Sequence, residues 1–227
     1  MVQILPAAAP DTVRQIVRFD RPPPGEELNT GHETVPRQAA SVIVVRGGTG
    51  ALELLLVQRT PRARFMGGYW VFPGGAVDAH EGEGDASHRA AAVRELEEEA
   101  AVGGIDPAAL VKFSRWITPR EIEIRYDTHF FIAALPETAQ AQVDGDECVD
   151  MGWFTPSGAL AAHGAGDLPL VFPTIKHLEQ LTPFASAQDL IDHATRHEVR
   201  PVTPRIVLEG EAARVLLPGE RGYKDAE

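Results

Sequence analysis

The fold of this chain is decided by the stretch Arg94-Glu-Leu-Glu-Glu-Glu-Ala-Ala-Val102. Strong helix formers dominate it, so we expect a helix over residues 87–102. At about 100° per residue, Glu95, Glu98 and Glu99 share one face of that helix, while apolar side chains occupy the opposite face. The sequence therefore predicts an amphipathic helix with three carboxylates on its polar side.

Three carboxylates at this spacing repel one another unless something compensates their charge. The repulsion is roughly a few tenths of a kcal/mol per pair, and a divalent cation would remove it. Mg²⁺ and Mn²⁺ bind carboxylate and phosphate oxygens and keep positions for water. Arg94, one turn before Glu98, is placed to orient a carboxylate. A solvated acidic face is the commoner origin of a glutamate-rich helix, so the helix alone leaves both explanations open.

Strands and helices are predicted on both sides of this helix. Apolar and β-branched runs predict strands at 41–45, 52–58, 69–72, 111–117, 128–134 and 149–154, and further apolar runs occupy 205–208 and 213–217. Periodic segments predict helices at 156–162, 173–181 and 187–197. Strands interrupted by one strong helix and followed by more helices indicate an α/β fold, with a mixed sheet between two helical layers.

The chain is expected to form one domain behind an N-terminal arm. Residues 1–36 contain six prolines, so we expect little regular structure there beyond one short helix near residues 11–17. The domain would cover residues 37–227, with a helical extension from about residue 173. Aromatic side chains in strands usually belong to the core, which is the place expected for Trp70, Trp116 and Trp153.

Charge and cysteine content exclude several classes of protein. The chain has 21 Lys and Arg against 33 Asp and Glu, a net charge of −12, which argues against broad binding to nucleic acid or anionic membranes. The one cysteine, Cys148, excludes an internal disulfide and fits a reducing compartment. No apolar run reaches the roughly 20 residues that cross a bilayer. We therefore expect a cytoplasmic protein that binds neither nucleic acid nor membrane.

The segment before the helix adds a second pattern. Phe72-Pro-Gly-Gly75 ends a predicted strand, and a polar loop then leads to the helix. Loop and helix together resemble the Nudix box, in which a glycine, five residues, a glutamate and seven residues precede Arg-Glu-aliphatic-x-Glu-Glu-x-Gly-aliphatic. The matching positions here are Gly75, Glu81, Arg94, Glu95, Leu96, Glu98, Glu99 and Val102.

The chain departs from that box at two places. Twelve residues, 82–93, stand between the loop glutamate and the arginine where seven are usual, so Glu83 competes with Glu81 for the loop position. Ala101 stands where a second glycine is usual. The insertion and the surrounding segments 65–75, 116–119, 125–131 and 173–175 resemble the subgroup that contains the peroxisomal coenzyme A diphosphatases. That similarity extends from about residue 39 to residue 181.

The resemblance implies a Nudix α/β/α sandwich with additional C-terminal helices, and it assigns roles. Glu95, Glu98 and Glu99 would bind Mg²⁺ or Mn²⁺ together with the carbonyl oxygen of Gly75, and a metal-activated water would attack one phosphorus of a diphosphate. Arg94, Glu95 and Glu98 would thus belong to the catalytic machinery. The loop glutamate would order the loop, with Arg94 as its partner.

Two further roles are less closely tied to the box. Glu147, in the acidic stretch before a predicted strand, is the candidate for a further ligand or the general base; Glu121 and Glu123 are alternatives, and an ordinary solvated turn is the plainer explanation. Arg59 and Arg125 are candidates for phosphate contacts, because each stands at a strand end near the motif and a guanidinium can bind two oxygens.

The box does not distinguish among substrates that share a linked diphosphate. We expect a small nucleotide, with coenzyme A or acyl-coenzyme A first, and ADP-ribose, other nucleotide sugars or dinucleotides as alternatives. A catalytically silent, nucleotide-sensing Nudix domain is the alternative from another class. The retained glutamates and the lack of a recognisable basic helix-turn-helix favour the enzyme. Pairing into a homodimer is compatible with this fold.

Overall fold

A computed structural model describes residues 16–17, 25–29, 31–48, 52–209 and 212–224 of the chain. The elements follow one another as β1 (Ile16–Val17), β2 (Arg37–Arg46), β3 (Glu53–Arg59), β4 (Trp70–Val71), β5 (Gly74–Ala76), η1 (Ala79–Glu81), α1 (Gly84–Ala100), η2 (Pro107–Ala109), β6 (Val111–Ile117), β7 (Tyr126–Ala134), β8 (Cys148–Phe154), α2 (Pro156–Ala165), α3 (Phe172–Leu181), α4 (Ala187–Arg196), β9 (Pro201–Val202), β10 (Arg205–Glu209) and β11 (Ala212–Leu216). The helices and strands expected from residue 39 onward all occur, with shifts of a few residues at their ends.

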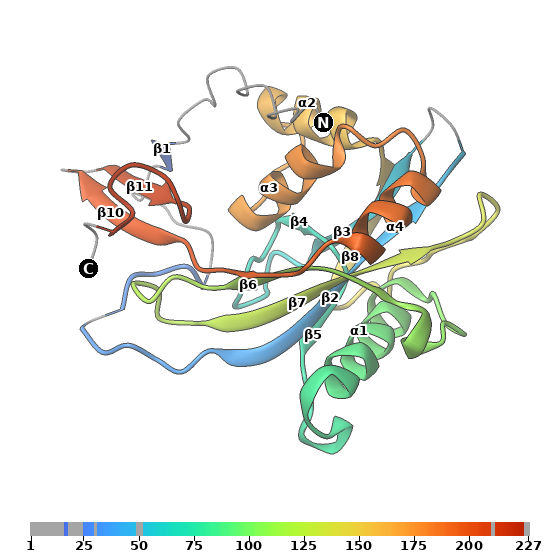
Figure 1. The fold of residues 1–227 in the computed structure, drawn as a ribbon, viewed down its shortest axis with the longest axis horizontal. Coiled ribbons are helices and arrows are strands. Elements are labelled where there is room, and N and C mark those ends of the chain that lie inside the picture. Colours follow the sequence, from blue (N-terminus) through green and yellow to red (C-terminus); the bar gives the residue numbers. More distant parts are fainter. Residues whose placement is uncertain (1–15, 18–24, 30, 49–51, 210–211, 225–227) are drawn as a thin grey trace, which may run out of the picture.

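The central sheet is mixed, as expected. Its strand order is β4-β3-β2-β7-β6-β9, with β5 paired to β2 and β8 paired to β3. The neighbours β2 and β7 run parallel, and so do β6 and β9, while β3 lies antiparallel to β2 and β8. A second, antiparallel sheet of order β1-β11-β10 lies beside the main body (Figure 1).

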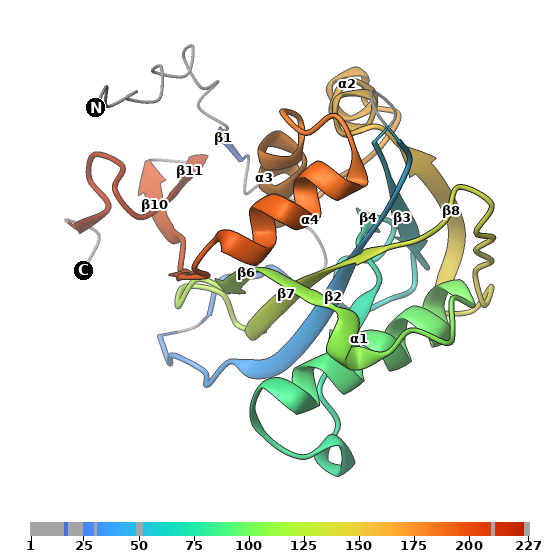
Figure 2. The same ribbon diagram turned by 45° about the vertical axis from the view of Figure 1, so that its right-hand side comes forward.

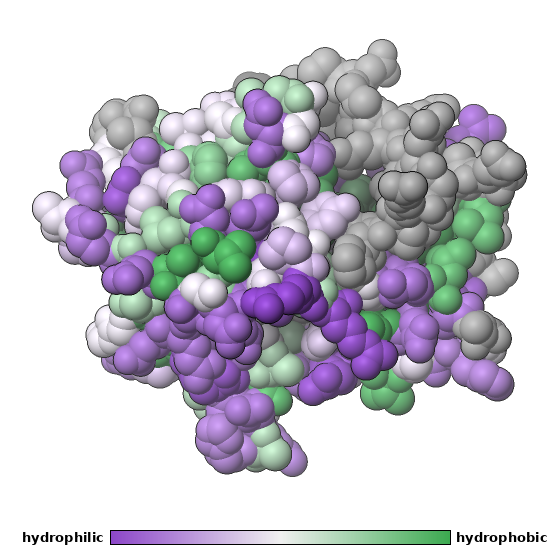
Figure 3. Space-filling view, turned by 180° about the vertical axis from the view of Figure 1, so that it is seen from behind, coloured by the Kyte–Doolittle hydropathy of each residue, from purple (hydrophilic) through white to green (hydrophobic). Residues whose placement is uncertain are grey.

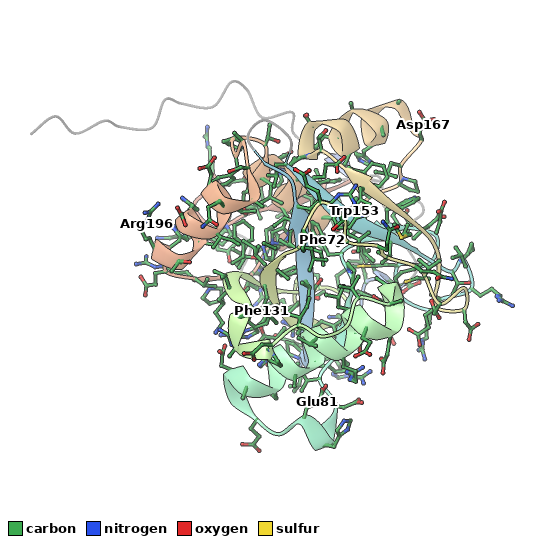
Figure 4. The ribbon with its side chains drawn as sticks, turned by 90° about the vertical axis from the view of Figure 1, so that its right-hand side faces the viewer. Phe72, Glu81, Phe131, Trp153, Asp167 and Arg196 are labelled. Atoms are coloured by element: carbon green, nitrogen blue, oxygen red, sulfur yellow. The ribbon has the colours of Figure 1, made fainter. Side chains whose placement is uncertain are left out.

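Helices cover both faces of the central sheet. Helix α1 lies on one face, and α2, α3 and α4 lie on the other (Figures 1 and 2). Successive side chains of β2 point to opposite layers: Val42 packs with Leu96 of α1, whereas Ile43 packs with the apolar side of α3 and α4. Phe131 and Phe72 divide in the same way between the two layers (Figure 4). Each fully buried aliphatic side chain contributes roughly 1.5–3 kcal/mol, so two cores hold the α/β/α sandwich together.

The three tryptophans differ in burial. Trp70 and Trp116 are buried in the core on the α3 side, which confirms the expectation for them. Trp153 is only partly buried and packs against the core on the α1 side of the sheet. The guanidinium carbon of Arg46 lies 3.9 Å from the centroid of its ring, so this indole also serves as a cation–π partner.

The N-terminal arm is partly described. Residues 11–15 of the expected short helix lie outside the described residues. Ile16 and Val17 form strand β1 against β11, so the prediction of a helix was wrong at these two residues. Residues 25–29 run beside the loop between β6 and β7, where Leu28 forms an isolated antiparallel bridge with Ile122. The part of the chain that is described contains no helix long and apolar enough to cross a membrane.

Candidate active site

A cleft of about 770 Å³ brings together much of the predicted site. Its walls come from the C-terminal ends of β3 and β4, from β5 and α1, from the loop between β6 and β7, and from the segment that leads into α3. Four predicted residues line it: Arg59, Gly75, Glu95 and Glu147. Its volume lies within the range of about 300–1,000 Å³ that is usual for small-molecule sites.

Arg94 is the centre of a network at one side of this cleft. Its Nε donates to Glu81 Oε1 at 3.0 Å, and its Nη1 donates to Glu95 Oε1 at 2.8 Å and to Glu98 Oε2 at 2.9 Å. Its Nη2 donates to the carbonyl oxygen of Ala76 at 3.0 Å. One guanidinium therefore ties the polar face of α1 to both ends of the preceding loop, as expected of an orienting residue.

The loop glutamate that meets Arg94 is Glu81. Its side chain is 5% exposed, and its second oxygen accepts the backbone N–H of Asp78 at 2.6 Å. Glu83 instead occupies the position just before α1, where its side chain makes no capping bond. The loop projects from the molecule as a mainly hydrophilic surface (Figure 3), and Glu81 lies below α1 on its inner side (Figure 4). The geometry thus gives the loop-ordering position to Glu81.

Glu99 is buried between β3 and β5. Its carboxylate accepts Arg59 Nη1 at 3.0 Å and the backbone N–H of Gly74 at 2.9 Å, and the residue is 1% exposed. Burial raises the pKa of Glu99 to about 7, although Gly74 and Arg59 act in the opposite direction and the charges of Glu95 and Glu147 add to the increase. Such a carboxylate lacks full charge compensation from the protein.

Glu95 lies against the glycine strand β5. A Cβ atom at Gly75 would collide with the Glu95 carboxylate, so only glycine lets the backbone and this carboxylate approach each other. Burial also raises the pKa of Glu95, and the negative charges of Glu98 and Glu147 add to that effect while Arg94 opposes it. Glu95 is therefore the member that connects the helix, the glycine strand and the cleft.

The three helix glutamates diverge more than the helical wheel suggests. The Glu98 side chain is 59% exposed and turns to Arg94, whereas the Glu99 side chain is 2% exposed and turns to Arg59. Among the described residues, no three acidic, histidine or cysteine side chains are gathered as a ready-made metal cluster. The reason is that Glu95 and Glu98 both turn to Arg94 on the same helix, while Glu99 turns to Arg59 of β3, a residue that a wheel of one helix does not contain.

Glu147 reaches the cleft from the loop before β8. Asp144 orders this loop by accepting the backbone N–H groups of Asp146, Glu147 and Cys148 at 3.2, 2.8 and 2.9 Å. Glu147 lines the same cleft as Glu95 and raises the pKa of both Glu95 and Glu99, so the three carboxylates interact electrostatically. Glu147 therefore lies at the same end of the cleft as the carboxylates of α1.

Other predicted residues lie apart from the cleft. Glu121 accepts Arg205 Nε at 3.1 Å, Glu123 is exposed, and neither lines the cleft. Arg125 is buried, and its guanidinium donates to Glu33 Oε1 at 2.7 Å and to carbonyl oxygens of two threonines. Arg125 is also absent from the cleft lining, so the structure does not bring it together with the glutamates. Of the two predicted arginines, only Arg59 borders the cleft.

The larger part of the cleft was not foreseen. Aromatic and aliphatic side chains wall it, together with one carboxyl group from the N-terminal arm; they include Glu26, Phe65, Tyr126, Phe172 and Ile206. These residues come from five separate segments, and no short motif links them. An acidic pair, Glu26-Glu27, in a proline-rich arm carries no local signal that one member faces a cleft.

Comparisons with known proteins agree with this geometry. A family model described as NUDIX domain matches residues 35–172. Human acyl-coenzyme A diphosphatase NUDT19 is 31% identical over 120 residues, which are 51% of this chain and 32% of that protein. The putative nudix hydrolase 7 of Caenorhabditis elegans is 26% identical over 180 residues, 64% of this chain and 60% of that protein. The chain therefore spans about a third of the length of the first relative and three fifths of the length of the second.

Solved structures share the fold. A NUDIX hydrolase from Alicyclobacillus acidocaldarius superposes with a TM-score of 0.63 at 24% identity, over 73% of this chain and 99% of that chain. The MutT protein from Bacillus halodurans superposes with a TM-score of 0.51 at 16% identity, over 81% of this chain and 99% of that chain. The family model covers more than half of the chain and includes the loop and helix that carry Glu81, Arg94 and Glu95, so the chain belongs to the Nudix family.

Proposed function

We propose that this protein hydrolyses the diphosphate link of a nucleoside diphosphate attached to another group, in a reaction that requires Mg²⁺ or Mn²⁺. The observation that carries the proposal is the pair of desolvated carboxylates, Glu95 and Glu99, whose pKa values are both raised and which interact with Glu147 beside one cleft. Perturbed carboxyl groups that share a cleft are typical of functional sites.

A divalent cation fits this set of donors. The buried carboxylate of Glu99 has one arginine, one backbone N–H and the Cys148 thiol as partners, and the glycine at position 75 leaves room that a Cβ would fill. Glu95, Glu98, Glu99 and the carbonyl oxygen of Gly75 would hold the ion, since hard cations prefer oxygen ligands. When bound, the cation would neutralise charge on the diphosphate and make a water molecule more acidic.

The protein's own arginines would orient the metal-binding carboxylates, and one of its glutamates would accept a proton. Arg94 holds Glu95 in place and ties it to the loop, while Arg59 does the same for Glu99. Glu147, on an ordered loop that lines the same cleft, would take the proton from the attacking water. The products would be a nucleoside monophosphate and a phosphorylated partner.

Coenzyme A or an acyl-coenzyme A is the substrate we propose first. Support comes from the similarity to the human acyl-coenzyme A diphosphatase and from the apolar walls of the cleft beyond the carboxylates. ADP-ribose and other linked diphosphates contain the same reacting group, so the assay must include them.

The test measures phosphate-bond cleavage with Mg²⁺ or Mn²⁺ for coenzyme A, an acyl-coenzyme A, ADP-ribose and a dinucleotide. Glu98→Gln should lower kcat/KM by at least about tenfold, because a metal ligand is lost. Glu97→Gln is the matched control: it removes the neighbouring, exposed carboxylate on the same helix. If neither metal supports cleavage of any of these compounds, the proposal of hydrolase activity is refuted and a nucleotide-sensing domain is favoured. Cleavage of ADP-ribose alone would refute only the coenzyme A assignment.

A further inference from the structure

A single carboxyl group from the N-terminal arm faces the apolar part of the cleft. Glu26 lines the cleft, and among the described residues no hydrogen bond or ion pair engages its side chain. The next residues hold it in place: Glu27 accepts the backbone N–H of Glu123 at 2.9 Å, and Leu28 bridges to Ile122. Glu26 is partly buried, so its carboxyl group has lost part of its hydration without gaining a partner among the described residues.

The surroundings of Glu26 are aromatic on one side. A Cβ atom at the preceding residue, Gly25, would lie 2.6 Å from a ring carbon of Phe65, so the arm packs directly on that ring. The Phe65 and Tyr126 rings lie 5.0 Å apart between centroids, and both residues line the cleft. Flat rings beside one hydrogen-bonding group are the combination with which proteins bind a heteroaromatic base.

The negative charge of Glu26 determines which part of a nucleotide the apolar part of the cleft can bind. A carboxylate repels the phosphates of a diphosphate, whereas Arg59 and Arg94 stand at the α1 side of the cleft. The uncharged end of the nucleotide therefore fits beside Glu26.

We propose that Glu26 recognises the amino-substituted edge of a purine base such as adenine, with the Phe65–Tyr126 pair against the ring. A carboxyl oxygen would accept the N–H of the amino group, and in its protonated form the group would also donate to the neighbouring ring nitrogen. Burial, together with the negative charge of Glu27, raises the pKa of Glu26 to about 7, so both forms are populated near neutral pH. The inference rests on the proposed function, since it assigns the base of that nucleotide substrate.

The experiment compares AMP with purine riboside 5′-monophosphate, which lacks only the amino group, by calorimetric titration of the full chain. The wild type should bind AMP about tenfold more tightly, the value of one hydrogen bond to a charged or polar group. Glu26→Leu should abolish this preference, and Glu26→Gln, which keeps an acceptor and a donor, should retain most of it. Glu27→Leu is the matched control, because that side chain is exposed and should leave the preference unchanged.

Equal affinity of the wild type for the two nucleotides would overturn the inference without any variant. A preference that survives in Glu26→Leu would also overturn it, because another group would then read the base. Failure of the proposed function is seen separately: the wild type would cleave no diphosphate with either metal, whatever its preference between the two monophosphates.

Discussion

Replacing Ala101 by glycine should stabilise the folded protein. Ala101 ends helix α1 with φ 52° and ψ 30°, and its N–H donates to the carbonyl of Glu97 at 3.0 Å, while the N–H of Val102 donates to that of Leu96. This is the left-handed C-terminal cap that glycine normally supplies. The exposed methyl group of Ala101 contributes no buried surface to offset the strain.

The size of the effect follows from two opposing terms. The left-handed conformation costs an alanine roughly 1–2 kcal/mol. Glycine loses more backbone freedom on folding, by about 0.5–1 kcal/mol. The net gain is therefore about 0.5–1 kcal/mol in the free energy of unfolding, or about 1–4 °C in Tm for a domain of this size.

Thermal unfolding by circular dichroism, with urea titration at fixed temperature, measures this change. Ala90→Gly is the matched control, because Ala90 lies within α1 at ordinary helical angles and should lose about 1 kcal/mol. An unchanged or lower Tm for Ala101→Gly, beside the expected loss for Ala90→Gly, would refute the reasoning. Activity should stay the same, since the carboxylates precede the cap.

Three further outcomes are expected. Arg94→Lys should lower kcat/KM by roughly 10–100-fold in initial-rate assays, because one amine cannot replace the forked contacts; Arg89→Lys, on the same helix but outside the network, should not. Burial lowers the pKa of His177 from 6.5 to about 3, so the stability it contributes is full above pH 6.5 and is lost as the pH falls below that value, by up to about 1.4 kcal/mol per pH unit. His177→Phe should flatten this decline in urea titrations between pH 6.5 and 4, and an unchanged slope would contradict the assignment. Glu147→Gln should slow the chemical step on the order of 100-fold while Glu121→Gln does not; the reverse order would move the base to the loop after β6.

Local sequence determined helix α1 and its chemistry. The spacing of Glu95, Glu98 and Glu99 follows from the helical repeat, and the apolar residues between them could only face the sheet. The glycine pair was expected only to end the preceding strand; the close approach of Gly75 to the Glu95 carboxylate is a feature of the fold. The order of strands and helices likewise follows from patterns a few residues long.

Helical spacing already pairs Glu98 with Arg94, four residues away, but tertiary structure alone decided where Glu99 turns. Glu99 points inward because β3 brings Arg59 to it, 40 residues away along the chain. The same holds for the buried Arg125, whose exposed partner Glu33 is 92 residues distant, and for the place of Glu26 in the cleft. A short motif specifies the helical spacing of its own residues but not which distant residues pack against them. The sequence therefore determined which side chains stand on one helix face, and the fold determined which partners those side chains meet.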